Sequence, residues 1–248
     1  MVTRVRHTAL LCALSVVAVG SGAGLACVDG AGPTELEQEG FLVGDVNVVA
    51  SKTPAVDGVI SGGEWANATK WKNLMINVPE GGTTEGQILI TNDNANLYIA
   101  LVVERDMPDI NANLVITFNN DGSGGLEEGD DYVVGGVDGW FYDGFYSDRF
   151  GGGLRGVGDG ADPTGTVDGA ASGGHSRGRT VIEVVHPLDS SDDAHDISVA
   201  PGDALTFLLN VNLFDSQGAT RTWLPWQTLK IACTKNGKIF RTRFCSSP

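Results

Sequence analysis

The sequence predicts an all-β fold: a two-sheet antiparallel β-sandwich, jelly-roll or immunoglobulin-like, with one short helix and a long glycine-rich loop. Five apolar runs alternate with period two, and Gly, Asn, Asp or Pro bounds each of them: 86–93, 96–104, 113–120, 180–188 and 204–214. Glycine occurs 35 times in 248 residues. This is about twice the average usage and lacks the three-residue period of collagen, so we expect many turns.

The run 96–104 indicates that one sheet is covered on both sides. Every odd-numbered residue from 97 to 103 is apolar, while the other side carries Tyr98, Ala100 and Val102 before Glu104. Such a partly polar second side is typical of a strand with two covered faces. The Asn- and Asp-rich segment 91–96 before it predicts a hairpin loop, because both residue types tolerate left-handed backbone.

Helix is scarce. The only helix that we expect runs from Gly63 to Lys70, after Ser61 as its cap. Between Gly122 and Gly178 lie 19 of the 35 glycines, and residues 151–178 show little apolar periodicity. The sequence therefore predicts a long loop there, either functional or mobile.

The first 26 residues have the pattern of a secretory signal peptide. Arg4 and Arg6 precede an apolar run at 8–20, and small residues follow up to Ala26. The run is too short to span a bilayer comfortably. We therefore expect a signal peptide over 1–26, an acidic polar tether over 27–44 and a single β-sandwich domain over 45–248, secreted or on the extracellular cell surface.

The segment Gly24 to Cys27 resembles a bacterial lipobox, in which the cysteine receives lipid, although Gly24 stands where that motif usually has leucine. Lipidation of Cys27 and ordinary cleavage near Ala26 are both open. A lipid anchor at Cys27 is the only membrane contact that we expect.

Charge argues against nucleic acid as a partner. Lys and Arg total 16 against 31 Asp and Glu, a formal net charge of −15, and a phosphate-binding surface needs the opposite sign.

Two of the four cysteines are expected to pair. A disulfide between Cys233 and Cys245 would close a short loop and contribute on the order of 3 kcal/mol. There is one conflict: if Asn236-Gly237 were a two-residue hairpin turn, Cys233 would face Phe240 instead.

Several motifs resemble those of one family. Val56-Asp57-Gly58, Glu64-Trp65-Ala66 and Asn96-Leu97-Tyr98, in this order, resemble the family 9 carbohydrate-binding modules and the wider DOMON-like sandwiches over about residues 55–225. Members include sugar binders on secreted glycosidases, calcium-containing modules and relatives that hold haem b. The resemblance therefore implies the fold more than the function.

Five carboxylates lie within residues 121–131, where they repel one another unless they are solvated or bridged by a cation. Calcium needs six to eight oxygen ligands on a bent loop. We expect Ca²⁺ at Asn119, Asp121, Glu128, Asp130 and Asp131. A solvated acidic turn is the alternative, because Thr117 occupies the first ligand position of an EF-hand loop and a strand precedes the segment.

Six aromatic rings occur in residues 140–150, with polar groups between them. Rings can stack on a sugar face while polar side chains bond its hydroxyls. The predicted carbohydrate-binding residues are Trp140, Tyr142, Tyr146, Arg149 and Trp226. The alternative is an aromatic edge of the sandwich that only packs.

His186 and His195 lie beside several aspartates, a composition that suits either a transition metal or a hydrogen-bonded turn. The haem-binding relatives use Met with His or Lys, which suggests Met75 or Met107 with His186, but nothing in the sequence brings such a pair together and haem is not expected. There is no nucleophile elbow, zinc-protease helix or phosphate loop, so we expect no enzyme.

Together these features predict a secreted, non-catalytic carbohydrate-binding module, stabilised by calcium, whose partner is a carbohydrate or cell-surface glycan. A structural or adhesive cell-surface domain is the alternative, and a haem b-binding DOMON-like domain is the third option. The glycan itself is not specified by the sequence.

Overall fold

The computed structural model describes residues 53–240, apart from 62, 67, 108–109, 150–152, 163–164, 191–194, 217 and 236–237. The predicted signal peptide, the tether, Cys27 and Cys245 lie outside the described residues. Thirteen strands and one 3₁₀ turn follow in order: β1 (Thr69–Asn77), β2 (Thr83–Asn92), β3 (Asn96–Val103), β4 (Asn111–Asn119), β5 (Asp131–Gly136), β6 (Phe141–Ser147), β7 (Arg155–Gly158), η1 (Asp159–Ala161), β8 (Ala170–Ser176), β9 (Arg179–Pro187), β10 (Ala204–Asp215), β11 (Gly218–Lys230), β12 (Cys233–Lys235) and β13 (Lys238–Phe240).

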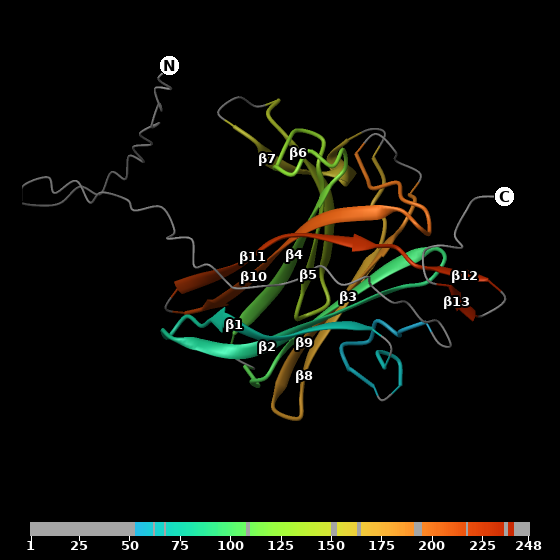
Figure 1. Cartoon of the computed structure of the whole chain (residues 1–248). Coiled ribbons are helices and arrows are strands. Elements are labelled where there is room, and N and C mark those ends of the chain that lie inside the picture. The colour runs from blue at the N-terminus through green and yellow to red at the C-terminus, as the bar shows by residue number, and fades with distance from the viewer. Residues whose placement is uncertain are drawn as a thin grey trace, which may run out of the picture. The chain divides into compact units, whose positions relative to one another are not determined.

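Eleven of these strands form two antiparallel sheets, as the sequence predicts, and β12 and β13 form a separate two-stranded sheet (Figure 1). One sheet has five strands in the order β1-β2-β3-β9-β8, and the other has six in the order β11-β10-β4-β5-β6-β7. All five predicted apolar runs are strands: β2, β3, β4, β9 and β10. In the described part of the chain, no helix is long and apolar enough to cross a membrane.

The main core lies between the two sheets. The odd-numbered side of β3 is buried there, together with Leu114, Ile116 and Phe118 of β4 and Phe207 of β10. Each such side chain contributes roughly 1.5–3 kcal/mol when it leaves water. Strand alternation therefore fixes which residues point inward, because a shift by one residue would expose the whole apolar set.

A second, smaller core covers the outer face of the five-stranded sheet. The chain before β1, blue in Figure 1, packs Trp65 against Tyr98, Ala100 and Val102. Glu183 of β9 ties this segment down: its carboxylate accepts hydrogen bonds from the Trp65 indole and from two backbone N–H groups. The prediction that both faces of this sheet are covered is confirmed.

The hairpin predicted at 91–96 is confirmed. Asp93 Oδ1 accepts hydrogen bonds from the N–H groups of Ala95 and Asn96, both at 2.8 Å. Its other oxygen accepts one from the Tyr98 hydroxyl, also at 2.8 Å.

The helix predicted from Gly63 to Lys70 is wrong for the described residues of that segment. Residues 63–66 form turns, and Thr69 and Lys70 already belong to β1. A single turn hydrogen bond joins Ala68 N–H to the Trp65 carbonyl. The backbone conformation here is set by the burial of Trp65 and its hydrogen bond to Glu183, which outweigh helix propensity.

The long loop predicted over 151–178 is also wrong in part, because β7, η1 and β8 lie within it. These strands lack apolar periodicity because their residues are small where other chain segments come close. A Cβ on Gly173 would lie 2.5 Å from the backbone of Val137, and one on Gly144 of β6 would lie 2.2 Å from the Val157 carbonyl oxygen of β7. Glycine here permits close approach, not flexibility.

At the C-terminal side, β12 and β13 form a hairpin in which Cys233 lies opposite Phe240 and Lys235 opposite Lys238. Two residues therefore separate the strands, which is the register that conflicts with a Cys233–Cys245 pair in a simple hairpin. Because Cys245 lies outside the described residues, the disulfide stays a prediction.

Candidate functional site

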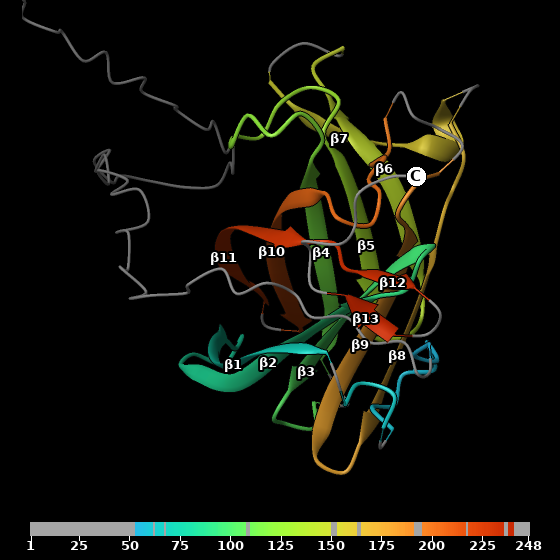
Figure 2. The ribbon, with the colours of Figure 1, turned by 45° about the vertical axis from the view of Figure 1, so that its right-hand side comes forward.

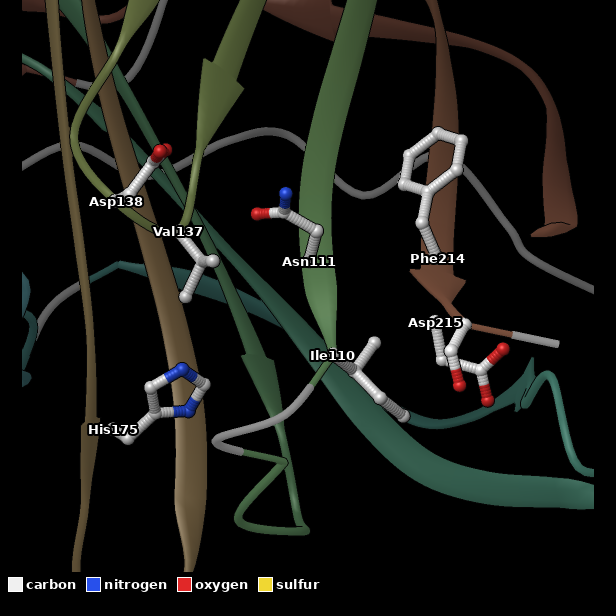
Figure 3. Close-up of a pocket in the computed structure, with 8 residues that line it drawn as sticks. Ile110, Asn111, Val137, Asp138, His175, Phe214 and Asp215 are labelled. Atoms are coloured by element: carbon white, nitrogen blue, oxygen red, sulfur yellow. The ribbon is translucent and has the colours of Figure 1, made fainter. Parts of the chain in front are cut away.

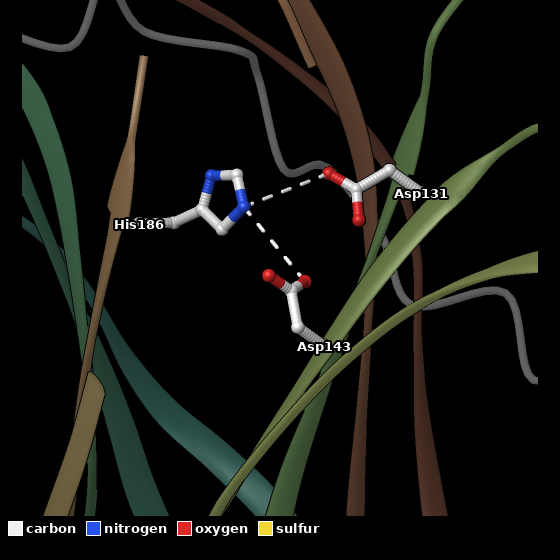
Figure 4. A group of neighbouring side chains, drawn as sticks. All are labelled: Asp131, Asp143 and His186. Atoms are coloured by element: carbon white, nitrogen blue, oxygen red, sulfur yellow. Dashed lines mark ion pairs between the residues drawn. The ribbon is translucent and has the colours of Figure 1, made fainter. Parts of the chain in front are cut away.

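A buried cluster of acidic side chains and one histidine lies where β5 begins. Asp131 of β5, Asp143 of β6 and His186 of β9 converge, as Figure 4 shows. His186 Nε2 lies 3.9 Å from Asp131 Oδ2 and 3.9 Å from Asp143 Oδ1. All three residues are buried, so the cluster joins the two sheets inside the sandwich.

Strand phase explains why these polar side chains are inside. Asp131 shares the inward side of β5 with Val133, and Asp143 lies directly opposite Val133 on β6. His186 follows Ile182 and Val184 on the inward side of β9. Each polar residue thus occupies a position that alternation reserves for the core.

The cluster extends to two further aspartates. Asp159 of the 3₁₀ turn and Asp196, before the described bridge at Ser198, are both buried. Carboxylate oxygens of Asp143, Asp159 and Asp196 all lie within 4.8 Å of one another. Asp143 is therefore common to two groups of three residues with metal-ligand spacing.

The histidine is held in one tautomer. His186 Nδ1 lies 2.7 Å from the Pro187 carbonyl oxygen, which only accepts, so Nδ1 carries the proton and Nε2 presents its lone pair. Burial lowers the pKa of His186 to about 4, which keeps the ring neutral. Phe118 packs against the ring with centroids 5.6 Å apart.

The carboxylates are only half satisfied by the protein. Asp131 Oδ2 accepts the Ile197 N–H at 3.3 Å and Asp143 Oδ2 accepts the Asp168 N–H at 2.6 Å. Asp131 Oδ1, Asp143 Oδ1 and His186 Nε2 have no hydrogen-bond partner among the described residues. Burial raises the pKa of Asp143 to about 8 and that of Asp131 well above its ordinary value. This arrangement suits either protons or a cation.

Of the predicted calcium ligands, the structure brings only Asp131 into this cluster. The other four bond within their own part of the chain. Asn119 donates to the Gly125 carbonyl, Asp121 and Asp130 accept backbone N–H groups, and Glu128 accepts the Ser147 hydroxyl. A surface pocket of about 320 Å³ nevertheless contains Asp121, Glu128, Asp130 and the buried Asp196 in its lining.

The predicted aromatic residues form separate groups on the six-stranded sheet, at β6 and at β11. Tyr142 and Tyr146 of β6 lie on its outer face with Tyr132 of β5, whose ring centroid is 5.7 and 4.8 Å from theirs. Trp140 precedes β6 and covers Gly136. Trp140 and Tyr142 are exposed at 41% and 38%. Tyr142 likewise covers Gly158 of β7, so part of its role is packing.

The two remaining predicted sugar ligands lie apart from these rings. Arg149 is exposed just after β6. Trp226 is half-buried in a bulge of β11, where Pro225 and Trp226 together face Leu208. The bulge agrees with the prediction that Pro225 marks an edge or bend.

Sequence reasoning missed Trp223, which is 57% exposed. It lies opposite Asn210 of β10, and this row continues across the outer face through Val115 and Val134 to Tyr142. Figure 2 shows these strands side by side from β11 to β6. Leu224 is apolar and points inward, so strand alternation would have predicted that its neighbour Trp223 points outward.

Two amide side chains lie next to Trp223 on this outer face. Asn212 donates to Asn113 Oδ1 at 2.7 Å. The Oδ1 atoms of Asn210 and Asn212 have no hydrogen-bond partner among the described residues. The exposed indole thus lies beside two buried amide side chains.

A pocket of about 540 Å³ lies at the other end of β5 from Asp131 (Figure 3). Its lining mixes apolar and polar residues: Ile110, Asn111, Val137, Asp138, His175, Phe214, Asp215 and Ser216. His175 contacts the Thr180 hydroxyl at 3.1 Å. The pocket is a second concave surface, separate from the buried cluster.

The histidine–methionine pairs considered for haem are not brought together. Met107 N–H bonds to Thr180 on β9, and His186 lies six residues further along that strand, about 20 Å away. Met75 is exposed on β1, opposite Glu85.

No protein-family model matches the chain, and no curated protein matches its sequence. Two similar solved structures are family 9 carbohydrate-binding modules from Caldicellulosiruptor kristjanssonii. The one in complex with cellotriose is 13% identical, covers 79% of this chain and 97% of its own, and has a TM-score of 0.49. The one in complex with glucose is 14% identical, covers 76% and 96%, and has a TM-score of 0.47. Both are of the family that the sequence motifs resemble.

Proposed function

We propose that this β-sandwich is a non-catalytic carbohydrate-binding module whose site lies on the outer face of the six-stranded sheet. One observation carries the proposal: the indole of Trp223 is 57% exposed on this face, in a row of outward side chains that leads to the exposed Tyr142. A sugar ring can stack on such an indole.

The far side of the same face supplies further contact area. Tyr142 lies in register with Trp223, four strands away or roughly 19 Å. Trp140 and Tyr146 flank it along the chain. The two aromatic groups at this separation favour an oligosaccharide over a single sugar ring.

The test is a titration of the mature chain with soluble polysaccharides and cello-oligosaccharides, followed calorimetrically. Trp223→Ala should weaken binding at least about tenfold, which corresponds to about 1.4 kcal/mol of lost stacking. Met75→Ala, an exposed strand residue of the other sheet, is the matched control and should bind as the parent does. Equal affinities for the parent and Trp223→Ala would rule out this face.

The pocket at the end of β5 is the competing location. Phe214→Ala changes its lining and leaves Trp223 in place. If Phe214→Ala loses the sugar and Trp223→Ala keeps it, the site is the pocket. A constant reducing-end concentration during long incubation with the ligand would support binding without turnover.

Calcium enters the proposal as a stabiliser of the acidic surface loop. The pocket at that loop offers side-chain oxygens from Asp121, Glu127, Glu128 and Asp130, the donor type that calcium prefers. Calcium should raise the melting temperature of chelator-treated protein, and Asp121→Asn should reduce the rise. An unchanged melting temperature would remove calcium from the proposal.

Export is also proposed, on the pattern of residues 1–26. Mass spectrometry of the mature chain decides between cleavage near Ala26 and lipidation of Cys27. A chain that retains residue 1 would contradict both.

The alternative function is a structural or adhesive surface domain. The observation that favours it is the packing of Trp140 over Gly136 and of Tyr142 over Gly158, since rings in that role stabilise the sheet. A glycan array with no binding, in calcium and in chelator alike, would favour this alternative.

A further inference from the structure

We propose that Asp131, Asp143 and His186 form a buried site for one divalent transition cation of the Zn²⁺ type, distinct from the calcium expected on the surface loop. The inference goes beyond carbohydrate binding and does not depend on it.

The distances fit a bridging ion better than direct hydrogen bonds. His186 Nε2 lies 3.9 Å from a carboxylate oxygen of each aspartate, which is too long for a hydrogen bond. Two ligands bound to one cation at about 2.0–2.2 Å lie roughly 3–4 Å apart. The two 3.9 Å separations, marked by the dashed lines in Figure 4, therefore lie in the range that a shared ion requires.

The facing atoms of His186 and Asp143 lack other partners. In the described part of the chain, His186 Nε2 and Asp143 Oδ1 are buried and have no hydrogen-bond partner, and His186 is only 1% exposed. The Asp131 oxygen that faces Nε2 is Oδ2, which accepts the Ile197 N–H, while Asp131 Oδ1 has no partner among the described residues. Because buried polar atoms are nearly always satisfied, an unpartnered imidazole nitrogen that faces two buried carboxylates points to a cation between them.

Backbone groups orient the side chains that would bind the ion. The Pro187 carbonyl holds the Nδ1 proton of His186, which is the usual way in which a metal-binding imidazole is oriented. The Asp168 N–H holds Asp143 Oδ2, which leaves Asp143 Oδ1 to face His186. The Ile197 N–H holds Asp131 Oδ2, the oxygen that itself faces His186.

The donor set selects the ion. Calcium takes oxygen ligands in numbers of six to eight, whereas zinc accepts imidazole nitrogen together with carboxylate oxygen in a set of four. Two carboxylates and a neutral imidazole carry two negative charges, which one divalent cation cancels. Within the described residues no lysine or arginine forms an ion pair with Asp131 or Asp143.

A surface pocket borders the buried cluster at Asp196. Asp196, whose carboxylate lies within 4.8 Å of that of Asp143, also lines the pocket that contains Asp121 and Glu127. Carboxylates that line this pocket raise the local concentration of cations.

The test uses the full chain, freed of metal with a chelator and dialysed, with all four cysteines replaced by serine so that no thiol binds zinc. Zn²⁺ should bind one to one and raise the melting temperature, and Mg²⁺ should do neither. His186→Gln should weaken Zn²⁺ binding by at least about tenfold and leave any calcium response of the surface loop intact. His175→Gln, at the far pocket, is the matched control and should bind as the parent does.

A second readout keeps the test decisive if His186→Gln does not fold. Co²⁺ bound to the parent should give visible absorption bands of a site with nitrogen ligation, and Zn²⁺ should displace them. Absence of these bands, or Zn²⁺ binding that His186→Gln leaves unchanged, would overturn the proposal. Calcium binding at the triad with no zinc uptake would overturn it as well.

Discussion

Strand β9 carries two buried polar sites on its opposite faces, and they differ in how their carboxylates obtain hydrogen-bond partners. Glu183, on the outer face, accepts hydrogen bonds from the Trp65 indole at 3.0 Å and from Asp57 and Gly58 N–H groups at 3.0 and 2.7 Å. On the inner face, His186 lies 3.9 Å from two carboxylates, each of which has one oxygen with no hydrogen-bond partner in the described part of the chain.

The difference separates a structural carboxylate from a binding one. A buried carboxylate is tolerated when protein donors surround it, and here the donors of Glu183 come from the segment that it anchors. In the inner cluster Asp131 and Asp143 each accept one backbone N–H, and each keeps an oxygen without a partner in the described part of the chain, so a proton or a cation is needed to offset their burial. Glu183 therefore stabilises the fold, while the inner cluster presents ligand atoms for a cation.

The largest effect is expected from Glu183→Ala. Loss of the carboxylate leaves the Trp65 Nε1–H and two backbone N–H groups buried without acceptors. The free energy of unfolding should fall by about 3–5 kcal/mol, measured by urea denaturation. Glu183→Gln keeps one acceptor oxygen and should lose less. A loss below about 1 kcal/mol for the alanine variant would show that the covering segment does not depend on Glu183.

A change of opposite sign is expected at Asp143. In chelator at a pH above 8, where Asp143 is ionised, Asp143→Asn keeps an acceptor for the Asp168 N–H and removes a buried charge beside Asp131, so stability should rise by about 1–2 kcal/mol. In Zn²⁺ the parent should become the more stable protein, since the variant has lost a ligand. If Asp143→Asn destabilises the metal-free protein, the two faces of β9 do not differ as described.

The sequence predicted β2, β3, β4, β9 and β10, whose inward positions are mostly apolar. β2, β3, β4 and β10 show clean alternation, and the hairpin at Asp93 follows from Asn and Asp chemistry. β5 and β6 were not predicted, because Asp131 and Asp143 interrupt the series of apolar residues at their inward positions. β7 and β8 escaped because glycine fills positions where backbones approach closely.

The metal site was predicted from the density of acidic residues in one segment of the sequence. That density does not show which residues of a strand point inward. Carboxylates crowd residues 121–131, yet only Asp131 lies in the buried cluster, because it begins a strand in the inward phase. Its partners on β6 and β9 lie 12 and 55 residues further along the chain, so only the pairing of strands brings them together. A polar residue at an inward strand position is the signal that could have identified Asp143 and His186.

The smallest effect is expected at Asp93, a half-buried carboxylate that the protein also satisfies. Burial alone would raise its pKa, but hydrogen bonds from Ala95, Tyr98 and Asn96 outweigh burial and lower the pKa. Asp93→Ala should lose about 1 kcal/mol at pH 7, because water replaces much of the lost bonding. A group whose pKa is lower in the folded chain stabilises above its unfolded pKa, near 3.9, and this stability is lost as the pH falls through the folded value.

The pH profile therefore distinguishes Asp93 from Glu183. The difference in free energy of unfolding between parent and Asp93→Asn should be constant from pH 5 to 8 and shrink below about pH 4. For Glu183 the sign is reversed: burial raises its pKa despite three hydrogen bonds, so its protonation favours the fold and its stabilising effect weakens as the pH rises. If the difference in free energy of unfolding between parent and Asp93→Asn grew on acidification, the hydrogen bonds at the hairpin would not stabilise the ionised Asp93. Asp93 would then resemble the carboxylates of the inner cluster.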